Sequence, residues 1–210
     1  MTIHEPATLA TDCVLAAIAA WLAHELRTQT SPENFSARWW VSALRLTAMS
    51  AFIGGTYHGF APNLSGPVVP FWWFVTLWFV ILTSAAMTIG WVHAVVRPSW
   101  RKPGFRLVVV KLAAFAVLAA FRPTFLVVIV DYGSSLLLWL GAALVLRRPW
   151  SGWMRAAIAL SIVAALVQQL HLAPAPWFNH NDLYHVIQAC GLAAFYRAAL
   201  CLVPSAPSVP

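Results

Sequence analysis

The sequence predicts an all-α fold, a polytopic bundle of seven transmembrane helices, and its composition and charge pattern lead to this prediction. Of the 210 residues, 61% are hydrophobic and only 9% are charged, whereas soluble domains carry roughly 25% charged residues. The twelve tryptophans belong to a residue type that concentrates at membrane–water interfaces. The formal net charge of +7 comes from short basic clusters between apolar runs, so it indicates membrane topology. Nucleic-acid binding would need basic stripes on a polar surface, and we exclude it.

A helix crosses the bilayer with about 20 apolar residues, and the chain offers seven such segments. The first contains Asp12 and lacks the basic flank of a cleaved signal peptide, so we interpret it as a retained span. The second ends in "GGTYHG", whose glycines predict close helix packing. The third contains no acidic residue, and the fourth is short. The expected spans are residues 8–26, 39–60, 69–96, 105–121, 123–146, 153–172 and 178–203. They would form one membrane domain over residues 1–203, followed by a disordered Pro/Ser-rich tail, 204–210.

The connecting loops alternate in charge, which predicts the orientation. The loops after the first, third and fifth spans hold the clustered basic residues, whereas the alternate loops contain only Arg122. Lys and Arg accumulate on the cytoplasmic side, so we expect an N-terminus outside and a cytoplasmic C-terminus, in the plasma (inner) membrane. Arg45 and Lys111 lie within spans, where their long stems can snorkel to the headgroups. This would put Lys111 at the wrong depth to pair with Asp131.

The polar residues of three spans converge on the outer side. The second span ends with His58, and the fifth carries Asp131 about two turns from its outer end. The seventh begins with "HNDLYH", which contains His180, Asp182 and His185. Ionisable side chains inside a bilayer are costly and mark functional sites by default. The sequence therefore predicts a site near the outer surface.

The start of the seventh helix decides whether its two histidines can meet. Inside one helix, His180 and His185 would lie about 140° apart. We expect Asn181 to be the N-cap, which would leave His180 before the helix and free to fold over its end. Asp182 would then lie in the first turn, where the helix dipole favours a carboxylate.

These residue types favour a catalytic zinc site. Such a site takes three protein ligands and leaves one position for water, and His58, His180 and His185 would supply the three. Asp131 or Asp182 would act as the general base and proton shuttle. The expected reaction is hydrolysis by a metal-activated water.

Seven spans, His58 at the end of the second span and the polar pair at the start of the seventh resemble the CREST group of membrane proteins. This group includes the alkaline ceramidases and the adiponectin-receptor-type PAQR proteins. The resemblance implies a zinc-dependent intramembrane hydrolase that cuts amide or ester bonds in lipids. The chain departs from the group's pattern: Asn181 and His185 stand where the last span has HxxxH, Gly54 stands at the serine position, and the third-span aspartate is missing. Asp131 would have to replace that aspartate.

Two alternatives stay open. The first is a non-catalytic membrane protein, either a transporter or a partner-binding subunit, in which the His/Asp cluster forms a proton or substrate path. The second is a b-type haem protein with His58 and His185 as axial ligands. The sequence predicts no particular substrate and no oligomeric state.

Overall fold

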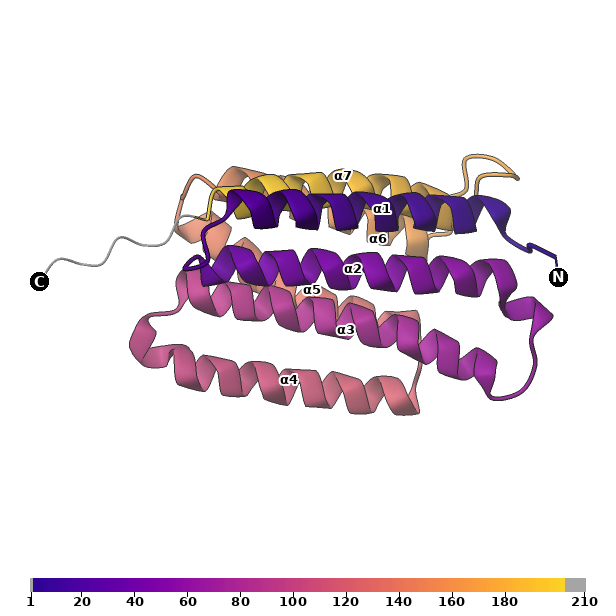
Figure 1. Cartoon of the computed structure of the whole chain (residues 1–210), viewed down its shortest axis with the longest axis horizontal. Helices are drawn as coiled ribbons and strands as arrows, with labels where there is room; N and C mark the ends of the chain where they lie inside the picture. Colours follow the sequence, from indigo (N-terminus) through magenta and orange to yellow (C-terminus); the bar gives the residue numbers. More distant parts are fainter. Residues whose placement is uncertain (1, 203–210) are drawn as a thin grey trace, which may run out of the picture.

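The computed structural model describes residues 2–202, and the regular elements within them are helical. Seven long α-helices run alternately in opposite directions along one bundle (Figure 1). Two 3-10 turns, η1 (Ala61–Asn63) and η2 (Pro98–Trp100), precede the third and fourth helices. The helices are α1 (Pro6–Gln29), α2 (Phe35–Phe60), α3 (Val68–Val95), α4 (Arg101–Phe121), α5 (Phe125–Val145), α6 (Ser151–Gln169) and α7 (His180–Leu200).

Each predicted segment coincides with one of these helices to within a few residues at each end. The largest differences are at α2 and α4, which both begin four residues earlier than predicted. The predicted domain end at residue 203 and the predicted tail lie outside the described residues. The all-helical prediction is therefore confirmed for the described part of the chain.

Five helices of the described chain are long and apolar enough to cross a membrane: α1, α3, α4 together with η2, α5 and α6. The other two, α2 and α7, are of similar length but have no stretch as apolar as those of the five, and α2 carries Arg38 and Arg45. These properties are compatible with an integral membrane protein. The count of seven spans and the orientation stay predictions.

Helix α1 occupies a central position for the site. It packs along α2 on one side and along α7 on the other, while α2 packs against α3 and α7 against α6. Helix α5 contacts α3 and α6, and α4 lies at the edge of the bundle against α3 and α5 (Figure 1). Polar side chains of α1 can therefore reach both α2 and α7.

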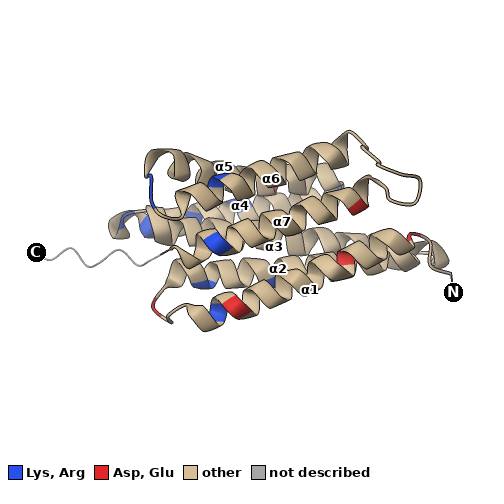
Figure 2. Ribbon diagram, turned by 90° about the horizontal axis from the view of Figure 1, so that it is seen from above, with Lys and Arg blue, Asp and Glu red and all other residues tan. Residues whose placement is uncertain are grey.

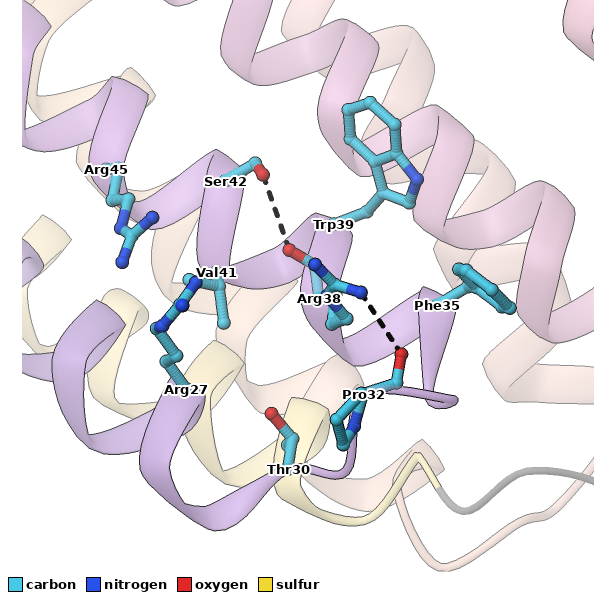
Figure 3. Close-up of a pocket in the computed structure, with 9 residues that line it drawn as sticks. All are labelled: Arg27, Thr30, Pro32, Phe35, Arg38, Trp39, Val41, Ser42 and Arg45. Carbon is cyan, nitrogen blue, oxygen red and sulfur yellow. Dashed lines mark hydrogen bonds between the residues drawn. The ribbon is translucent and has the colours of Figure 1, made fainter.

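The two ends of the bundle differ in charge. Lys and Arg gather at the end where α1, α3, α5 and α7 finish and α2, α4 and α6 begin (Figure 2). We call this the basic end. A cavity of about 500 Å³ lies there between α1 and α2 (Figure 3). The predicted site residues His58, His180 and His185 belong to the opposite end.

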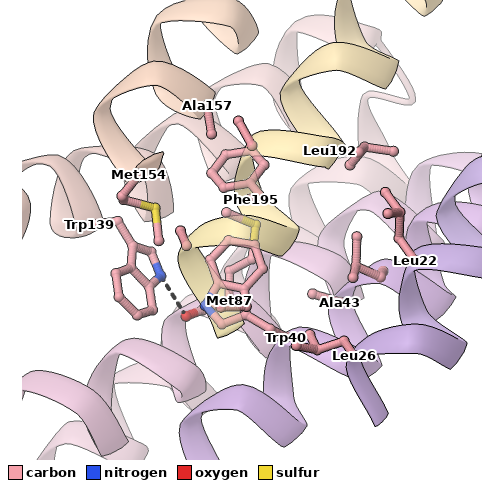
Figure 4. Packing of buried hydrophobic residues seen from close by; sticks show 14 of the residues in the cluster. Leu22, Leu26, Trp40, Ala43, Met87, Trp139, Met154, Ala157, Leu192 and Phe195 are labelled. Carbon is pink, nitrogen blue, oxygen red and sulfur yellow. Dashed lines mark hydrogen bonds between the residues drawn. The ribbon is translucent and has the colours of Figure 1, made fainter. Parts of the chain in front are cut away.

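The three largest fully buried side chains, Trp40, Trp139 and Phe195, pack together in the basic half of the bundle (Figure 4). Trp40 of α2 stacks on Phe195 of α7 with 5.0 Å between ring centroids, and Trp139 of α5 lies 5.5 Å from Trp40. The Trp139 indole donates a hydrogen bond to the Met87 carbonyl oxygen at 3.0 Å, which satisfies the polar atom that a buried tryptophan brings with it. This aromatic contact fixes α2, α5 and α7 against one another.

Candidate functional site

His185 lies in the second turn of α7, and polar side chains of α1 contact both of its ring nitrogens. Nε2 is 3.1 Å from Asp12 Oδ1, and Nδ1 is 3.0 Å from Thr11 Oγ1. Asp12 is 4% exposed and His185 8%. One turn of α1 therefore holds the imidazole in a site largely shielded from solvent.

The partners on α1 form one stripe. Thr8 and Asp12 are four residues apart in α1, which places them on one helix face, and Glu5 is the N-cap directly before the helix. Thr8 Oγ1 donates to Asp182 Oδ1 at 2.9 Å, and Glu5 Oε2 lies 3.4 Å from His58 Nδ1. The stripe thus connects α1 to α7 and, nearer the chain's start, to α2.

The start of α7 differs from the prediction. The N-cap is Asn179, two residues before the expected Asn181. Its side chain accepts from the backbone N–H of Asn181 at 2.7 Å and of Asp182 at 3.3 Å. Asp182 Oδ2 in turn accepts from the Asn179 backbone N–H at 2.7 Å. This reciprocal pair is a capping box, so Asp182 stabilises the helix end through one oxygen and contacts α1 through the other.

The corrected helix start places His180 inside α7 as its first residue, not before the helix. It therefore lies about 140° around the helix from His185. Its ring packs against His171, which follows α6, with 4.6 Å between centroids. His58, His180 and His185 each contact a different partner: Glu5, His171, and Asp12 with Thr11. Among residues 2–202, no group of three His, Cys, Asp or Glu side chains is placed to hold a metal ion.

Glycines allow α2 to approach the site, as the sequence predicts. A Cβ built on Gly55 would lie 2.6 Å from Cβ of Asp12, and one on Gly59 would lie 3.0 Å from Leu9 Cδ2. Real Cβ atoms do not approach that closely, so a larger residue would push α2 away from α1. Gly55 therefore sets the distance between α2 and the acidic partner of His185.

Asp131 belongs to a second cluster and corrects the prediction for Lys111. Lys111 Nζ lies 2.6 Å from Asp131 Oδ1 and donates to Ser84 Oγ at 2.7 Å and Ser135 Oγ at 3.1 Å. Helix α4 begins at Arg101, which places Lys111 about 15 Å from the basic end at 1.5 Å per residue. The four-carbon stem of Lys111 extends from this level to Asp131. Lys111 therefore points into the bundle and does not snorkel to the basic end.

The sequence interpretation missed Asp12 and Thr11 as site residues. Asp12 lies six residues into α1 and His185 five residues into α7, so both are about 8–9 Å from the same end of the bundle at 1.5 Å per residue. The depth of each residue in its segment is the signal in the sequence that could have found this pair.

The hydrogen bonds of Thr11 determine what the Asp12–His185 contact requires. A hydroxyl has one proton to donate, and the Thr8 carbonyl oxygen lies 3.1 Å from Thr11 Oγ1. Two other acceptors lie within reach of the same proton, His185 Nδ1 at 3.0 Å and Asp182 Oδ1 at 3.5 Å. If Thr11 donates to Nδ1, the neutral imidazole carries its proton on Nε2 and donates it to Asp12 Oδ1. If Thr11 donates to Thr8, Nδ1 carries the proton and donates to Thr11, and a proton or a metal ion has to lie between Nε2 and Asp12 Oδ1.

The same geometry suits a metal ion. Two ligand atoms of one tetrahedral zinc, each about 2.0–2.1 Å from it, lie about 3.3 Å apart, close to the 3.1 Å between Asp12 Oδ1 and His185 Nε2. A metal-binding histidine commonly donates its other N–H to a protein oxygen, which fixes the tautomer, and Thr11 takes that position. Two ligands of a metal site therefore fit, and a proton would fit the same pair.

A protein-family model described as "Family of unknown function (DUF6962)" matches residues 7–202 of the chain. The match extends from the second residue of α1 to the end of α7 and includes every candidate site residue except Glu5. No curated protein and no solved structure matches the chain.

Proposed function

Because the chain belongs to the DUF6962 family, whose function is unknown, we propose a function from the site itself: a zinc-dependent intramembrane hydrolase that cleaves an amide or ester bond of a lipid. The observation that carries the proposal is the buried contact of Asp12 Oδ1 with His185 Nε2 at 3.1 Å, a separation that two ligand atoms of one zinc ion would have. The sequence resemblance to the CREST group motivates the choice of zinc and of a lipid substrate.

In this proposal Asp12 and His185 would supply two of the zinc's protein ligands, and Thr11 would keep the imidazole in the required tautomer. When bound, zinc polarises the substrate carbonyl and activates water. His58 and Glu5 contact each other at 3.4 Å and lie nearer the end of the bundle, where they would carry a proton to the leaving group. Asp12 and Glu5 thereby join the predicted site residues, and Asp131 is replaced as the proton carrier.

The proposed setting is the plasma (inner) membrane, with the N-terminus outside and the basic end in the cytoplasm. The orientation can be tested with two single-cysteine variants, made in a chain whose native cysteines have been replaced. One carries Ser65→Cys between α2 and α3, and the other carries Ser99→Cys in η2. An impermeant maleimide should label the Ser65→Cys variant in intact cells and the Ser99→Cys variant only after permeabilisation. The opposite pattern would reverse the orientation and place the site on the cytoplasmic side.

The metal is the first part of the proposal to test. The protein would be purified in mild detergent without chelators, and its bound metals measured by mass spectrometry. Near-stoichiometric zinc is expected in the wild type and in a His24→Ala control, which changes an exposed histidine near the other end of α1. His185→Ala and Asp12→Asn should both lose it, and both should lose release of fatty acid from lipid amides or esters.

A wild type without zinc, or with zinc that both site variants retain, would contradict the metal assignment. A Soret band in the purified protein would instead support the haem alternative.

A second candidate, a proton-coupled transporter, is favoured by the buried Lys111–Asp131 pair. Ion pairs among membrane helices mark ion and proton paths in many transporters, and this pair lies beside the hydroxyls of Ser84 and Ser135. Proteoliposomes with a trapped pH dye would test it. Proton uptake that survives chelation and disappears in Asp131→Asn would favour transport over hydrolysis.

A further inference from the structure

A cavity at the basic end combines three arginines with an apolar wall. It lies between the last turn of α1, the following loop and the first three turns of α2, and its volume is about 500 Å³. Arg27 of α1 and Arg45 of α2 extend toward each other across it, and Arg38 lies at its other side (Figure 3). The remaining lining residues are Thr30, Pro32, Phe35, Trp39, Val41 and Ser42.

The arginines keep unused hydrogen-bonding capacity. In the described part of the chain, Arg27 and Arg45 have no ion pair and no side-chain hydrogen bond, and Arg38 donates to the Pro32 carbonyl oxygen at 3.2 Å. Each guanidinium offers five N–H donors in a planar fork that matches phosphate oxygens. Most of the donors around this cavity are therefore available to a ligand.

The neighbouring carboxylates do not neutralise the cavity. No acidic side chain lines it. Glu25 accepts from Gln29 Nε2 at 3.2 Å, and Glu33 accepts from Ser31 Oγ at 2.6 Å. The Ser31 hydrogen bond and, to a smaller extent, the charge of Arg38 lower the pKa of Glu33. This carboxylate is therefore charged and offsets part of the Arg38 charge, whereas the other two arginines have no ion pair in the described chain. The cavity thus carries an excess of positive charge that a ligand has to balance.

The arrangement along α2 fits a ligand that is charged at one end and apolar at the other. Arg38 and Arg45 are seven residues apart, so they lie on one face of α2 about 10 Å apart along the axis. Phe35 is 54% exposed and lines the same cavity as Trp39. Tryptophan concentrates at the headgroup level of membranes, and basic pockets between membrane helices bind anionic lipid headgroups.

We propose that this cavity binds the phosphate headgroup of an anionic phospholipid from the leaflet at the basic end. Arg27 and Arg45 would hold the phosphate oxygens from two sides, and Phe35 and Trp39 would contact the glycerol and acyl parts. The lipid would bridge α1 and α2, the two helices that carry Asp12 and His58 at their other ends. The inference does not depend on the proposed hydrolase activity.

The test compares two double variants that remove equal charge from the basic end. Arg27→Gln/Arg45→Gln alters the cavity, and Arg106→Gln/Arg155→Gln alters two exposed arginines of α4 and α6 outside it. Purified protein would be titrated with phosphatidylglycerol or phosphatidylcholine in mixed micelles, and bound lipid counted by native mass spectrometry. The wild type should prefer phosphatidylglycerol. The cavity variant should bind it roughly 30-fold more weakly, from the contribution of two surface arginines, and the control variant less than about threefold.

A third variant, Arg27→Lys/Arg45→Lys, keeps the charge but loses the planar forks, and it should lie between the wild type and the cavity variant. Equal losses in the two glutamine variants would overturn the proposal, because bulk charge would then explain the binding. Displacement of the lipid by millimolar inorganic phosphate would also overturn it, since the site would then take free phosphate. Equal binding of phosphatidylglycerol and phosphatidylcholine by the wild type would also overturn the proposal.

Discussion

Replacing Lys111 by Met tests the second polar cluster, because it removes the cation that faces Asp131 and keeps an unbranched side chain. Lys111 Nζ lies 2.6 Å from Asp131 Oδ1 and also donates to two serine hydroxyls. Asp131 is 1% exposed, and its Oδ2 has no hydrogen-bond partner within the described chain. The substitution would leave a buried carboxylate without a counter-charge.

The expected loss follows from that burial. Removing one partner of a buried ion pair costs about 3–5 kcal/mol, whereas removing both charges is often nearly neutral. Lys111→Met should therefore lower the free energy of unfolding by about 3–5 kcal/mol. The double change Lys111→Met/Asp131→Asn should recover most of it, to within about 1–2 kcal/mol of the wild type. With the single change Asp131→Asn measured as well, the loss of the double variant minus the two single losses gives the coupling energy of the pair.

Unfolding by sodium dodecyl sulfate in mixed micelles, followed by circular dichroism, measures these values. Lys102→Met is the matched control, since Lys102 lies exposed in the first turn of α4, and it should stay within about 0.5 kcal/mol of the wild type. If Lys111→Met were as stable as this control, Lys111 would have no buried partner. The result would then favour a lysine that snorkels to the headgroups, as the sequence predicts.

Three further changes test the α1–α2–α7 site. Gly55→Ala should destabilise the fold by about 1–3 kcal/mol from overpacking. Thermal unfolding measures this against the control Gly133→Ala, whose added Cβ meets no atom within 4 Å. Equal effects of the two changes would show that α1 and α2 can separate freely. Asn179→Ala should cost about 1 kcal/mol through loss of the N-cap, seen as a lower unfolding midpoint, and no change would remove the capping box as a determinant of the α7 start. Thr11→Val should weaken zinc affinity about 10- to 100-fold in a competition titration with a chelating dye while leaving helix content unchanged. Unchanged affinity would show that Thr11 does not orient His185.

The positions of the helices could be predicted because apolar runs and charged loops alternate along the chain. The close approach at Gly55 and Gly59 was predictable for the same kind of reason, since small residues at helical spacing let backbones come together. Helix starts were less accurate. At α7 the sequence offers both Asn179 and Asn181 as caps, and the reciprocal bond with Asp182 three residues on favours Asn179. That two-residue error was enough to misplace His180.

The pairing of buried charges could not be predicted from depth alone. Lys111 was assigned to the wrong level because its helix begins four residues earlier than expected and because a lysine stem spans more than one helical turn. Asp12 and His185 lie at matching depths, but depth alone does not indicate that the first and seventh helices pack against each other. In both cases the neighbour in space comes from the packing of helices against one another, which a single sequence does not specify.

The Lys111–Asp131 pair has a consequence for how the chain would enter a bilayer. Its two members lie on consecutive helices, α4 and α5, which are joined by the loop around Arg122. Each helix inserted by itself would carry an uncompensated charge into hydrocarbon, at a cost of roughly 2.5–3.5 kcal/mol on insertion scales. A hairpin of both helices that inserts as one unit cancels the charge within itself. The pair thus favours delivery of α4 and α5 to the membrane together, before α6 has been synthesised.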